Sequence, residues 1–80
     1  MTLQGHISYV TSVSIFPDGD RVISASYDKT LKVWDMKTGQ VIASFTGESG
    51  MLCCAVAPDG LTIAAGDKSG RVHFLRLMGV

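Results

Sequence analysis

The 80-residue chain contains one sequence unit twice. The tripeptide Pro17-Asp18-Gly19 recurs as Pro58-Asp59-Gly60, at an offset of 41 residues. Hydrophobic residues recur at the same offset, in the pairs Ile15 and Val56, Val22 and Ile63, Leu31 and Val72, and Val33 and Phe74. Because most of the chain is two copies of one unit, the fold must be one that two similar units can each adopt and then stack together.

Within each copy, hydrophobic residues alternate with polar ones, which is typical of β-strands with one buried face. Val13 and Ile15 fall on one side of the first such segment, while Ser12 and Ser14 fall on the other. Turns rich in Pro, Asp and Gly separate the segments. The predicted strands are residues 9–16, 21–26, 30–35 and 40–45 in the first copy and 51–57, 61–66 and 71–77 in the second.

Four short antiparallel strands in one repeat indicate a β-propeller blade, which is about 40–45 residues long. We therefore predict an all-β chain of two four-stranded antiparallel propeller blades. Residues 1–46 form the first blade together with an N-terminal closing segment, and residues 47–80 form a second, degenerate blade. Only Leu77-Met78-Gly79-Val80 follows the third strand of the second copy, so that blade lacks a proper fourth strand of its own.

The first copy resembles a blade of the WD-repeat family. Gly5-His6, the turn at Pro17 and a run ending in Trp34-Asp35 occur in the order of that family's pattern. The resemblance covers residues 3–77, and the second copy resembles the last blade of a longer bacterial WD-repeat protein. The family resemblance implies a propeller that binds other proteins.

The resemblance also implies a structural tetrad in the first copy, made of His6, Ser24, Asp28 and Trp34. In this tetrad the indole donates to the serine, the serine donates to the histidine, and the aspartate holds the imidazole. A Ser/His/Asp set could also be a hydrolase triad, but no nucleophile elbow is present and the indole occupies the serine side. We therefore expect the tetrad to fix the shape of the blade, and we expect no enzymatic activity.

The second copy has none of the four tetrad residues, because Glu48, Ala65, Ser69 and Leu75 stand at the matched positions. We expect this blade to depend on apolar packing and to be the weaker of the two. Asp67 could partly substitute, although its register differs by two positions. His73 is predicted to be a solvated or edge residue and not a metal ligand.

Two adjacent cysteines, Cys53 and Cys54, are the only cysteines of the chain. Neighbouring cysteines rarely form a disulfide, because their Cβ vectors diverge. No histidine or cationic residue lies beside them in the sequence, so we predict that both are small core residues. Free thiols favour a reducing, cytoplasmic setting. No metal site and no cofactor motif is recognisable.

The balance of charge and hydrophobicity limits the possible partners. Seven basic and seven acidic residues give a net charge of zero with no Lys/Arg cluster, which argues against nucleic acid as a partner. No apolar run approaches the roughly 20 residues of a membrane-spanning helix, so no membrane association is expected. Hydrophobic residues make up 46% of the chain and charged ones 18%, which is more apolar surface than so short a chain can bury by itself.

Two stacked blades leave one uncovered face at each end of the stack. A closed ring of several chains would cover these faces, so we predict a cyclic homo-oligomer. A tetramer with eight blades is favoured, and a trimer with six is second. We also expect Met1–Gln4 of one protomer to complete the outer edge of its neighbour's last blade.

WD-repeat propellers bind their partners mostly at the rim of the central channel. Matched by motif, the resemblance points to Tyr9, Thr11, Tyr27, Leu52 and Lys68 as partner-binding residues. The predicted function is a non-catalytic scaffold that assembles into a propeller and binds protein or peptide partners there. A purely structural or engineered propeller fragment without a ligand is an open alternative, and a small hydrolase is another.

Overall fold

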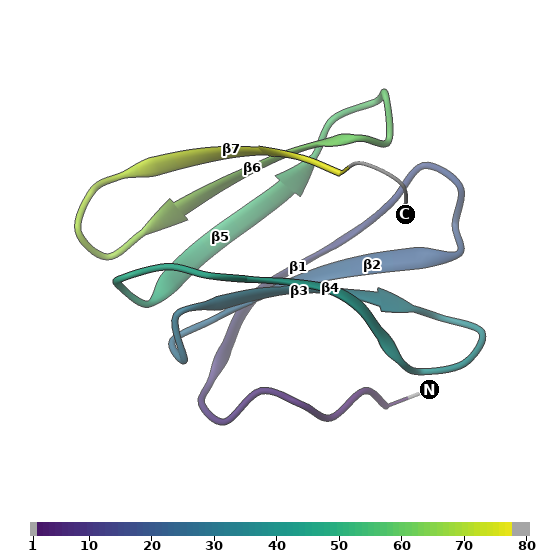
Figure 1. Ribbon diagram of the computed structural model, residues 1–80, viewed down its shortest axis with the longest axis horizontal. Helices are drawn as coiled ribbons and strands as arrows, with labels where there is room; N and C mark the ends of the chain where they lie inside the picture. Colours follow the sequence, from purple (N-terminus) through teal and green to yellow (C-terminus); the bar gives the residue numbers. More distant parts are fainter. Residues whose placement is uncertain (1, 78–80) are drawn as a thin grey trace.

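The computed structural model describes residues 2–77, which form seven β-strands in two antiparallel sheets (Figure 1). The first sheet, called the first blade, contains β1 (Val10–Ile15), β2 (Arg21–Ser26), β3 (Thr30–Asp35) and β4 (Val41–Thr46) in that order. The second sheet, called the second blade, contains β5 (Met51–Val56), β6 (Thr62–Asp67) and β7 (Val72–Arg76). Each blade is a meander in which consecutive strands pair.

The predicted all-β fold of two antiparallel sheets is confirmed. The predicted strand ranges differ from the observed ones by no more than one residue at either end. The expectation of four strands in each blade holds for the first, whereas the second has three strands in the part of the chain that the structure describes. The residues predicted to follow β7, Met78–Val80, lie outside the described part, as does Met1 of the predicted closing segment.

The two Pro-Asp-Gly turns are built in the same way in both blades. Gly19 and Gly60 have φ of 74° and 71°, the left-handed region that glycine occupies without steric cost. In each turn the preceding aspartate accepts a hydrogen bond from the amide two residues later. Asp18 accepts from Asp20 at 2.9 Å, and Asp59 accepts from Leu61 at 2.8 Å. The sequence repeat is therefore also a repeat of backbone geometry.

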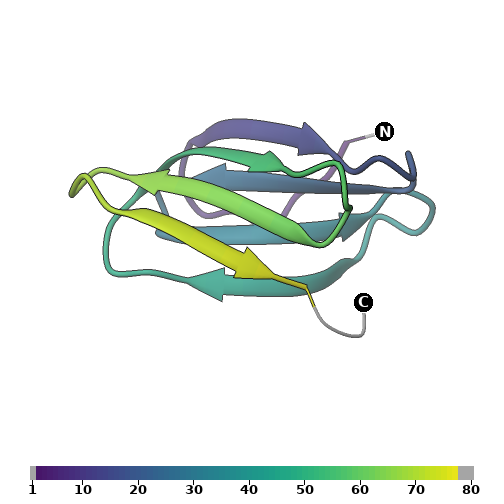
Figure 2. The same ribbon diagram turned by 90° about the horizontal axis from the view of Figure 1, so that it is seen from above.

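The two blades lie face to face as two layers, and the hydrophobic core lies between them (Figures 1 and 2). Its largest side chains are Phe16, Ile23 and Leu31 from the first blade and Met51 and Ile63 from the second, each at most 2% exposed. Burying side chains of this size contributes about 1.5–3 kcal/mol each relative to leaving them in water. The stacking of the blades therefore contributes strongly to the stability of the fold.

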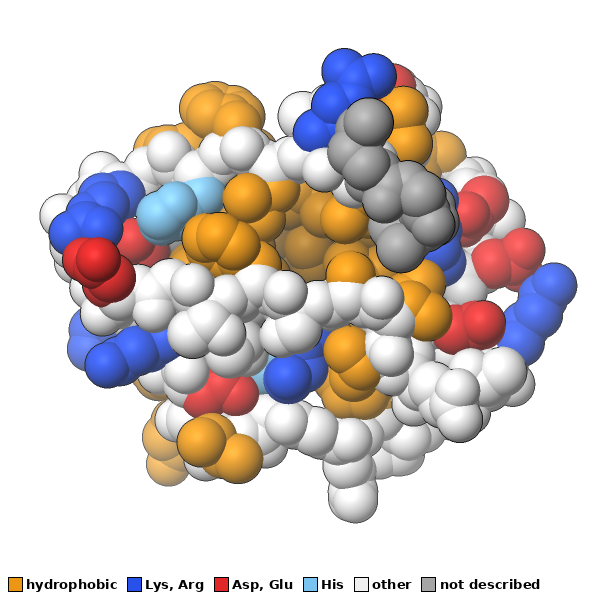
Figure 3. All heavy atoms as spheres, in the orientation of Figure 1, with side chains coloured by type: hydrophobic (Ala, Val, Ile, Leu, Met, Phe, Trp, Pro, Cys, Tyr) orange, Lys and Arg blue, Asp and Glu red, His pale blue; other side chains and the backbone are white. Residues whose placement is uncertain are grey.

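The layers contact each other through β1, β2 and β5. Farther out an apolar hollow remains between the layers, lined in part by Ala43 and Phe45 of β4 and by Leu75 and Leu77 at the end of the second blade. The hydrophobic side chains in this opening are visible between the two layers in Figure 3. Contact at the first strands and separation at the last strands is the wedge that successive blades need to turn around a central axis.

Candidate functional site

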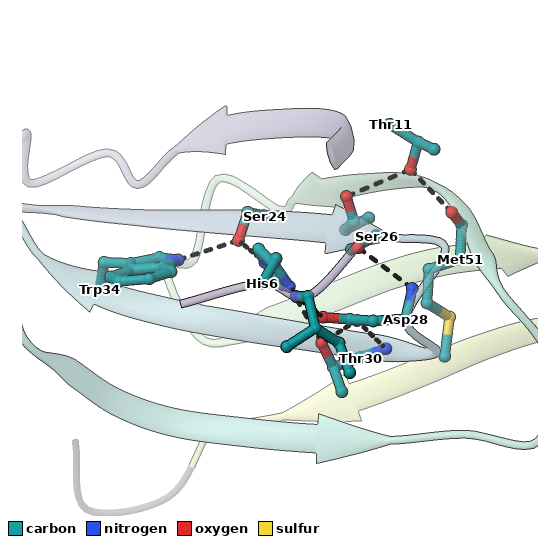
Figure 4. Close-up of polar contacts among 10 residues, drawn as sticks. His6, Thr11, Ser24, Ser26, Asp28, Thr30, Trp34 and Met51 are labelled. Atoms are coloured by element: carbon teal, nitrogen blue, oxygen red, sulfur yellow. Dashed lines mark hydrogen bonds and ion pairs between the residues drawn. The ribbon is translucent and has the colours of Figure 1, made fainter. Parts of the chain in front are cut away.

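The four predicted tetrad residues lie together on the first blade and form one chain of hydrogen bonds (Figure 4). Trp34 Nε1 donates to Ser24 Oγ at 2.8 Å. Ser24 Oγ lies 2.6 Å from His6 Nε2, and His6 Nδ1 lies 2.9 Å from Asp28 Oδ2. Because the indole can only donate and the carboxylate can only accept, Ser24 donates to His6 and His6 donates to Asp28.

This network ties together three separate segments of the first blade. Ser24 lies on β2, Trp34 lies on β3, and His6 belongs to the segment before β1. The side chains of His6 and Asp28 are 5% and 4% exposed, so their hydrogen bonds are shielded from water. A fully satisfied buried network of this kind fixes the path of each contributing segment.

Thr30 completes the network, although it is not part of the predicted tetrad. Its hydroxyl donates to Asp28 Oδ1, and its backbone amide donates to the same oxygen at 2.9 Å. Burial alone raises the pKa of Asp28, but the hydrogen bonds from Thr30, His6 and the amide of Ile7 outweigh it and hold that pKa well below 3.8. The position of Thr30, two residues after an aspartate at a turn, is the sequence signal that points to it.

The second blade contains a different polar network, centred on Asp67, which is 4% exposed. Asp67 Oδ1 accepts hydrogen bonds from the Ser69 amide at 2.9 Å and from the Ser69 hydroxyl at 2.5 Å. Asp67 Oδ2 accepts from His73 Nε2 at 2.8 Å. The hydrogen bonds from Ser69 and His73, together with the amide of Arg71, hold the pKa of Asp67 well below 3.8.

These contacts bear on two predictions for the second blade. Asp67 substitutes for the missing tetrad with partners of its own, so the blade depends on this polar network as well as on apolar packing. His73 lies on the edge strand β7, as predicted, but it is not solvated. Its side chain is 20% exposed, and its ring packs 5.6 Å from the ring of Phe45.

Three of the predicted partner-binding residues gather at one end of the stacked blades. Tyr9 and Tyr27 make an edge-to-face pair with ring centroids 6.4 Å apart, and the ammonium of Lys68 lies 5.3 Å from the Tyr27 ring. The three residues come from the segment before β1, the β2–β3 turn and the β6–β7 turn. They are called the rim cluster below. Ile7, which the motif did not indicate, is 93% exposed two residues before Tyr9.

The other two predicted partner-binding residues occupy equivalent β-bulges. Thr11 is the unpaired extra residue of β1, and Leu52 is the unpaired extra residue of β5. The Thr11 hydroxyl lies 2.7 Å from the carbonyl oxygen of Met51 across the layers and 3.2 Å from that of Ala25 in its own blade, so its shorter hydrogen bond runs between the blades (Figure 4). Leu52 is 43% exposed.

The predicted core position is correct for Cys54 and wrong for Cys53. Cys54 is 8% exposed, faces Ser12 of the first blade, and has a thiol pKa raised by burial. Cys53 is exposed on the opposite face of the second blade. Because adjacent residues of a strand point to opposite faces, only one of the two thiols can enter the core between the two blades of one chain.

Each blade has one face buried against the other blade and one outer face, and residues 41 positions apart match the outer faces to the buried ones. The face by which the second blade packs on the first contains Met51, Cys54, Val56, Ile63, Ala65 and Leu75. The residues 41 positions earlier form the upstream face of the first blade, namely Val10, Val13, Ile15, Val22, Ser24 and Trp34. Val10, Val13 and Ile15 of this face are 51%, 60% and 61% exposed.

The second exposed face follows the same rule. The first blade packs on the second through Ile23, Ala25, Leu31 and Val33. Their copies, Ala64, Gly66, Val72 and Phe74, form the downstream face of the second blade together with Cys53 and Ala55. Val72 and Phe74 are 62% and 73% exposed, and the other four residues line a shallow apolar hollow with Val72. Each outer face is thus a copy of a face that is buried inside the chain.

The fold and the tetrad define two consecutive blades of a WD-repeat β-propeller. The chain belongs to the family described as the TEP-1 C-terminal beta-propeller, whose model matches residues 6–77. Proteins described as ribosome biogenesis protein BOP1 homologues from Drosophila ananassae, Drosophila willistoni and Drosophila melanogaster are 33% identical to it over 72 residues. These matches cover 85% of this chain and 9% of each relative.

A solved structure agrees with this assignment. The crystal structure of the β-propeller domain of Myceliophteria thermophila Cps50 (Swd1) matches with a TM-score of 0.88 and 19% sequence identity. The match covers 95% of this chain and 25% of that chain. At this identity the likeness shows the shared fold.

The geometry of the tetrad serves the structure of the blade. A hydrolase would need Ser24 to meet a substrate, but Ser24 is 6% exposed and its oxygen already accepts the Trp34 N–H. Among the described residues no group of His, Cys, Asp and Glu side chains is arranged to hold a metal ion. Within the same part of the chain, no helix has the length and apolar character needed to cross a membrane.

Replacing Asp28 with Asn should destabilise the fold and weaken its response to acid. Because the pKa of Asp28 lies below 3.8 in the folded protein, its carboxylate stabilises the fold fully above that value. This contribution is lost as the pH falls through the acidic range, and Asn has no such contribution to lose. Urea unfolding from about pH 7 down to about pH 2.5 should show a smaller loss of stability for Asp28→Asn.

Asp20→Asn is the matched control, because the Asp20 side chain is 56% exposed. It should leave both the stability and its pH dependence close to wild type. Equal acid responses in wild type and Asp28→Asn would contradict the role given to the buried network.

Replacing Asp67 with Asn should loosen the second blade locally. Asn keeps the size of Asp67 but weakens the charge-assisted hydrogen bonds from Ser69, Arg71 and His73. Hydrogen exchange should become faster in β6 and β7 and stay unchanged in β3 and β4. Ser69→Ala removes one hydroxyl donor and should have a smaller effect. A uniform change over all strands would mean that Asp67 does not stabilise the second blade in particular.

Proposed function

We propose that this chain is a non-catalytic scaffold unit that joins further blades in a propeller and binds protein or peptide partners at its rim. The observation that carries the proposal is that both outer faces are apolar copies of faces that are buried between the two blades. An isolated pair would leave Val13, Ile15 and Phe74 in water. Contiguous exposed apolar patches of this kind mark interaction surfaces.

The proposed assembly is a ring of identical chains stacked head to tail. Such contacts join two different faces, so they form a closed ring when the rotation per chain divides a full turn. Each chain brings two blades, so the ring has an even number of blades. Four chains with eight blades are the favoured form, and three chains with six blades are the second. The segment 1–4 is proposed to complete the outer edge of the neighbouring chain's last blade.

The rim cluster supports the proposal of a partner-binding surface. Edge-to-face packing holds Tyr9 and Tyr27 in fixed positions, while Tyr9 is 78% exposed and Tyr27 is 42% exposed. Rigid aromatic residues give large contact areas at low entropic cost. Lys68 adds one positive charge beside the rings, and Ile7 extends the apolar area. These features fit a peptide with an apolar or aromatic anchor next to a carboxylate.

We propose a reducing compartment such as the cytoplasm as the location of the protein. Both cysteines are free thiols, and Cys53 is exposed to solvent. In an oxidising compartment, Cys53 of chains that have not yet assembled would form disulfides between molecules.

Replacing both rim tyrosines, Tyr9→Ala with Tyr27→Ala, should weaken partner binding without unfolding the blades. Peptides selected from a displayed random library on the wild-type protein provide the probe. Their affinity should fall by about tenfold or more, the range found for aromatic hot spots. The control Thr38→Ala, in the exposed β3–β4 turn at the other end of the strands, should leave the peptide affinity unchanged. Unchanged affinity of the double variant would exclude the rim cluster as the binding surface.

Replacing Ile15 with Lys should prevent assembly. Ile15 is 61% exposed in the single chain and is the repeat copy of Val56, which packs against the core between the blades. A buried lysine without a partner costs several kcal/mol, which is enough to dissociate a ring. Sedimentation should give a smaller mass for Ile15→Lys than for wild type, while Thr38→Lys, with the same added charge on an exposed turn, should keep the wild-type mass. Equal masses for wild type and Ile15→Lys would contradict the proposed use of the upstream face.

A further inference from the structure

We infer that a second copy of this chain docks on the upstream face in the register that the two blades already use within one chain, placing its Leu52 and Cys53 against Val10 and Val13. This inference rests on the proposed assembly and specifies its contacts. It also assigns Leu52 to the contact between chains instead of the partner-binding rim.

The internal contact supplies the template for this register. Thr11 Oγ1 donates to the Met51 carbonyl oxygen at 2.7 Å. Next to it, the Cys54 amide donates to Ser12 Oγ at 3.3 Å, and Cys54 Sγ lies 3.8 Å from the same oxygen. The bulge residue of β1 and its neighbour therefore reach across to the first strand of the following blade.

The repeat transfers these contacts to the boundary between two chains. The copies of Thr11 and Ser12 in the second blade are Leu52 and Cys53, which occupy the same β-bulge. Val10 and Val13 of the first blade are the repeat equivalents of Met51 and Cys54. If a second chain continues the same stacking, Leu52 lies over Val10 and Cys53 lies over Val13.

The exposure of these residues agrees with that arrangement. Met51 and Cys54 are 0% and 8% exposed because another blade covers them. Val10 and Val13, in the same places on the first blade, are 51% and 60% exposed. A covering blade with the internal geometry would bury them equally.

The contact between chains differs from the internal one in polarity. Leu52 replaces Thr11, so the hydroxyl that links the two blades inside the chain has no counterpart between chains. Cys53 replaces Ser12 in the same way. The contact between chains is thus held by apolar packing.

Cross-linking with the variant Val13→Cys tests the register. In the internal contact, Cys54 Sγ lies 3.8 Å from Ser12 Oγ. In the proposed register, the cysteine at position 13 faces Cys53 of the next chain in the same way. Only a small rotation would then bring the two sulfurs to disulfide distance. The variant is made with Cys54→Val, so that the introduced cysteine and Cys53 are the only thiols. Mild oxidation should link chains covalently, and mass spectrometry of digests should find position 13 joined to Cys53.

Three controls accompany this variant. Adding Cys53→Ser should remove the link between position 13 and residue 53. Thr38→Cys with Cys54→Val places a thiol in an exposed turn and reports random collision, so Val13→Cys should link about tenfold faster or more. Ser12→Cys in the otherwise natural chain should form a disulfide with Cys54 within one chain, because it reproduces the internal contact.

The results of these experiments test the register of stacking and the existence of the assembly separately. An oligomeric wild-type chain in which Val13→Cys links no faster than Thr38→Cys would overturn the register and leave the proposed assembly standing. A monomeric wild-type chain without selective linking would overturn both. Selective linking of position 13 to Cys53 supports the inference at any affinity of the assembly.

Discussion

The stacking of one apolar sheet face on another is the interaction on which the rest of this structure depends. β-strands from both copies of the repeat contribute hydrophobic residues to one layer between the blades, with Ile23 and Leu31 on one side and Met51 and Ile63 on the other. A sheet with two apolar faces is stable in water only when both faces are covered. The chain covers the facing sides of the two blades, and its segment before β1 also covers Val22, Ser24 and Trp34 on the upstream face. The rest of each outer face remains apolar and exposed.

Polar networks then fix the shape of each blade, and the two blades do so with different residues. In the first blade, His6 connects Ser24 to Asp28 and so attaches the segment before β1 to the sheet. In the second blade, Asp67 binds the β6–β7 turn and His73 of β7. Both networks place an ionised carboxylate among hydrogen-bond donors, although the carboxylates stand at different positions of the repeat. The same backbone geometry therefore tolerates an exchange of the polar residues that hold it.

Much of the fold could be predicted from the sequence, because strand alternation and turn residues are local signals. The Pro-Asp-Gly turns and the alternation around Val13 define the strands, and the resemblance to WD repeats brings Trp34, Ser24 and His6 together. The pairing of Asp67 with His73 could not be predicted, because it depends on which side chains point to the same face after the turn. The different fates of Cys53 and Cys54 were equally hidden, since a run of apolar residues does not show which face is buried.

The two outer faces are copies of the internal contact, and we propose that they stack on each other for that reason. Light scattering over a range of concentrations measures the mass of the wild-type chain in solution and tests this stacking. We expect a discrete, well-folded assembly of four chains, or of three, that does not grow with concentration once the ring has closed. A well-folded monomer at all concentrations, with Val13, Ile15 and Phe74 left in water, would contradict it.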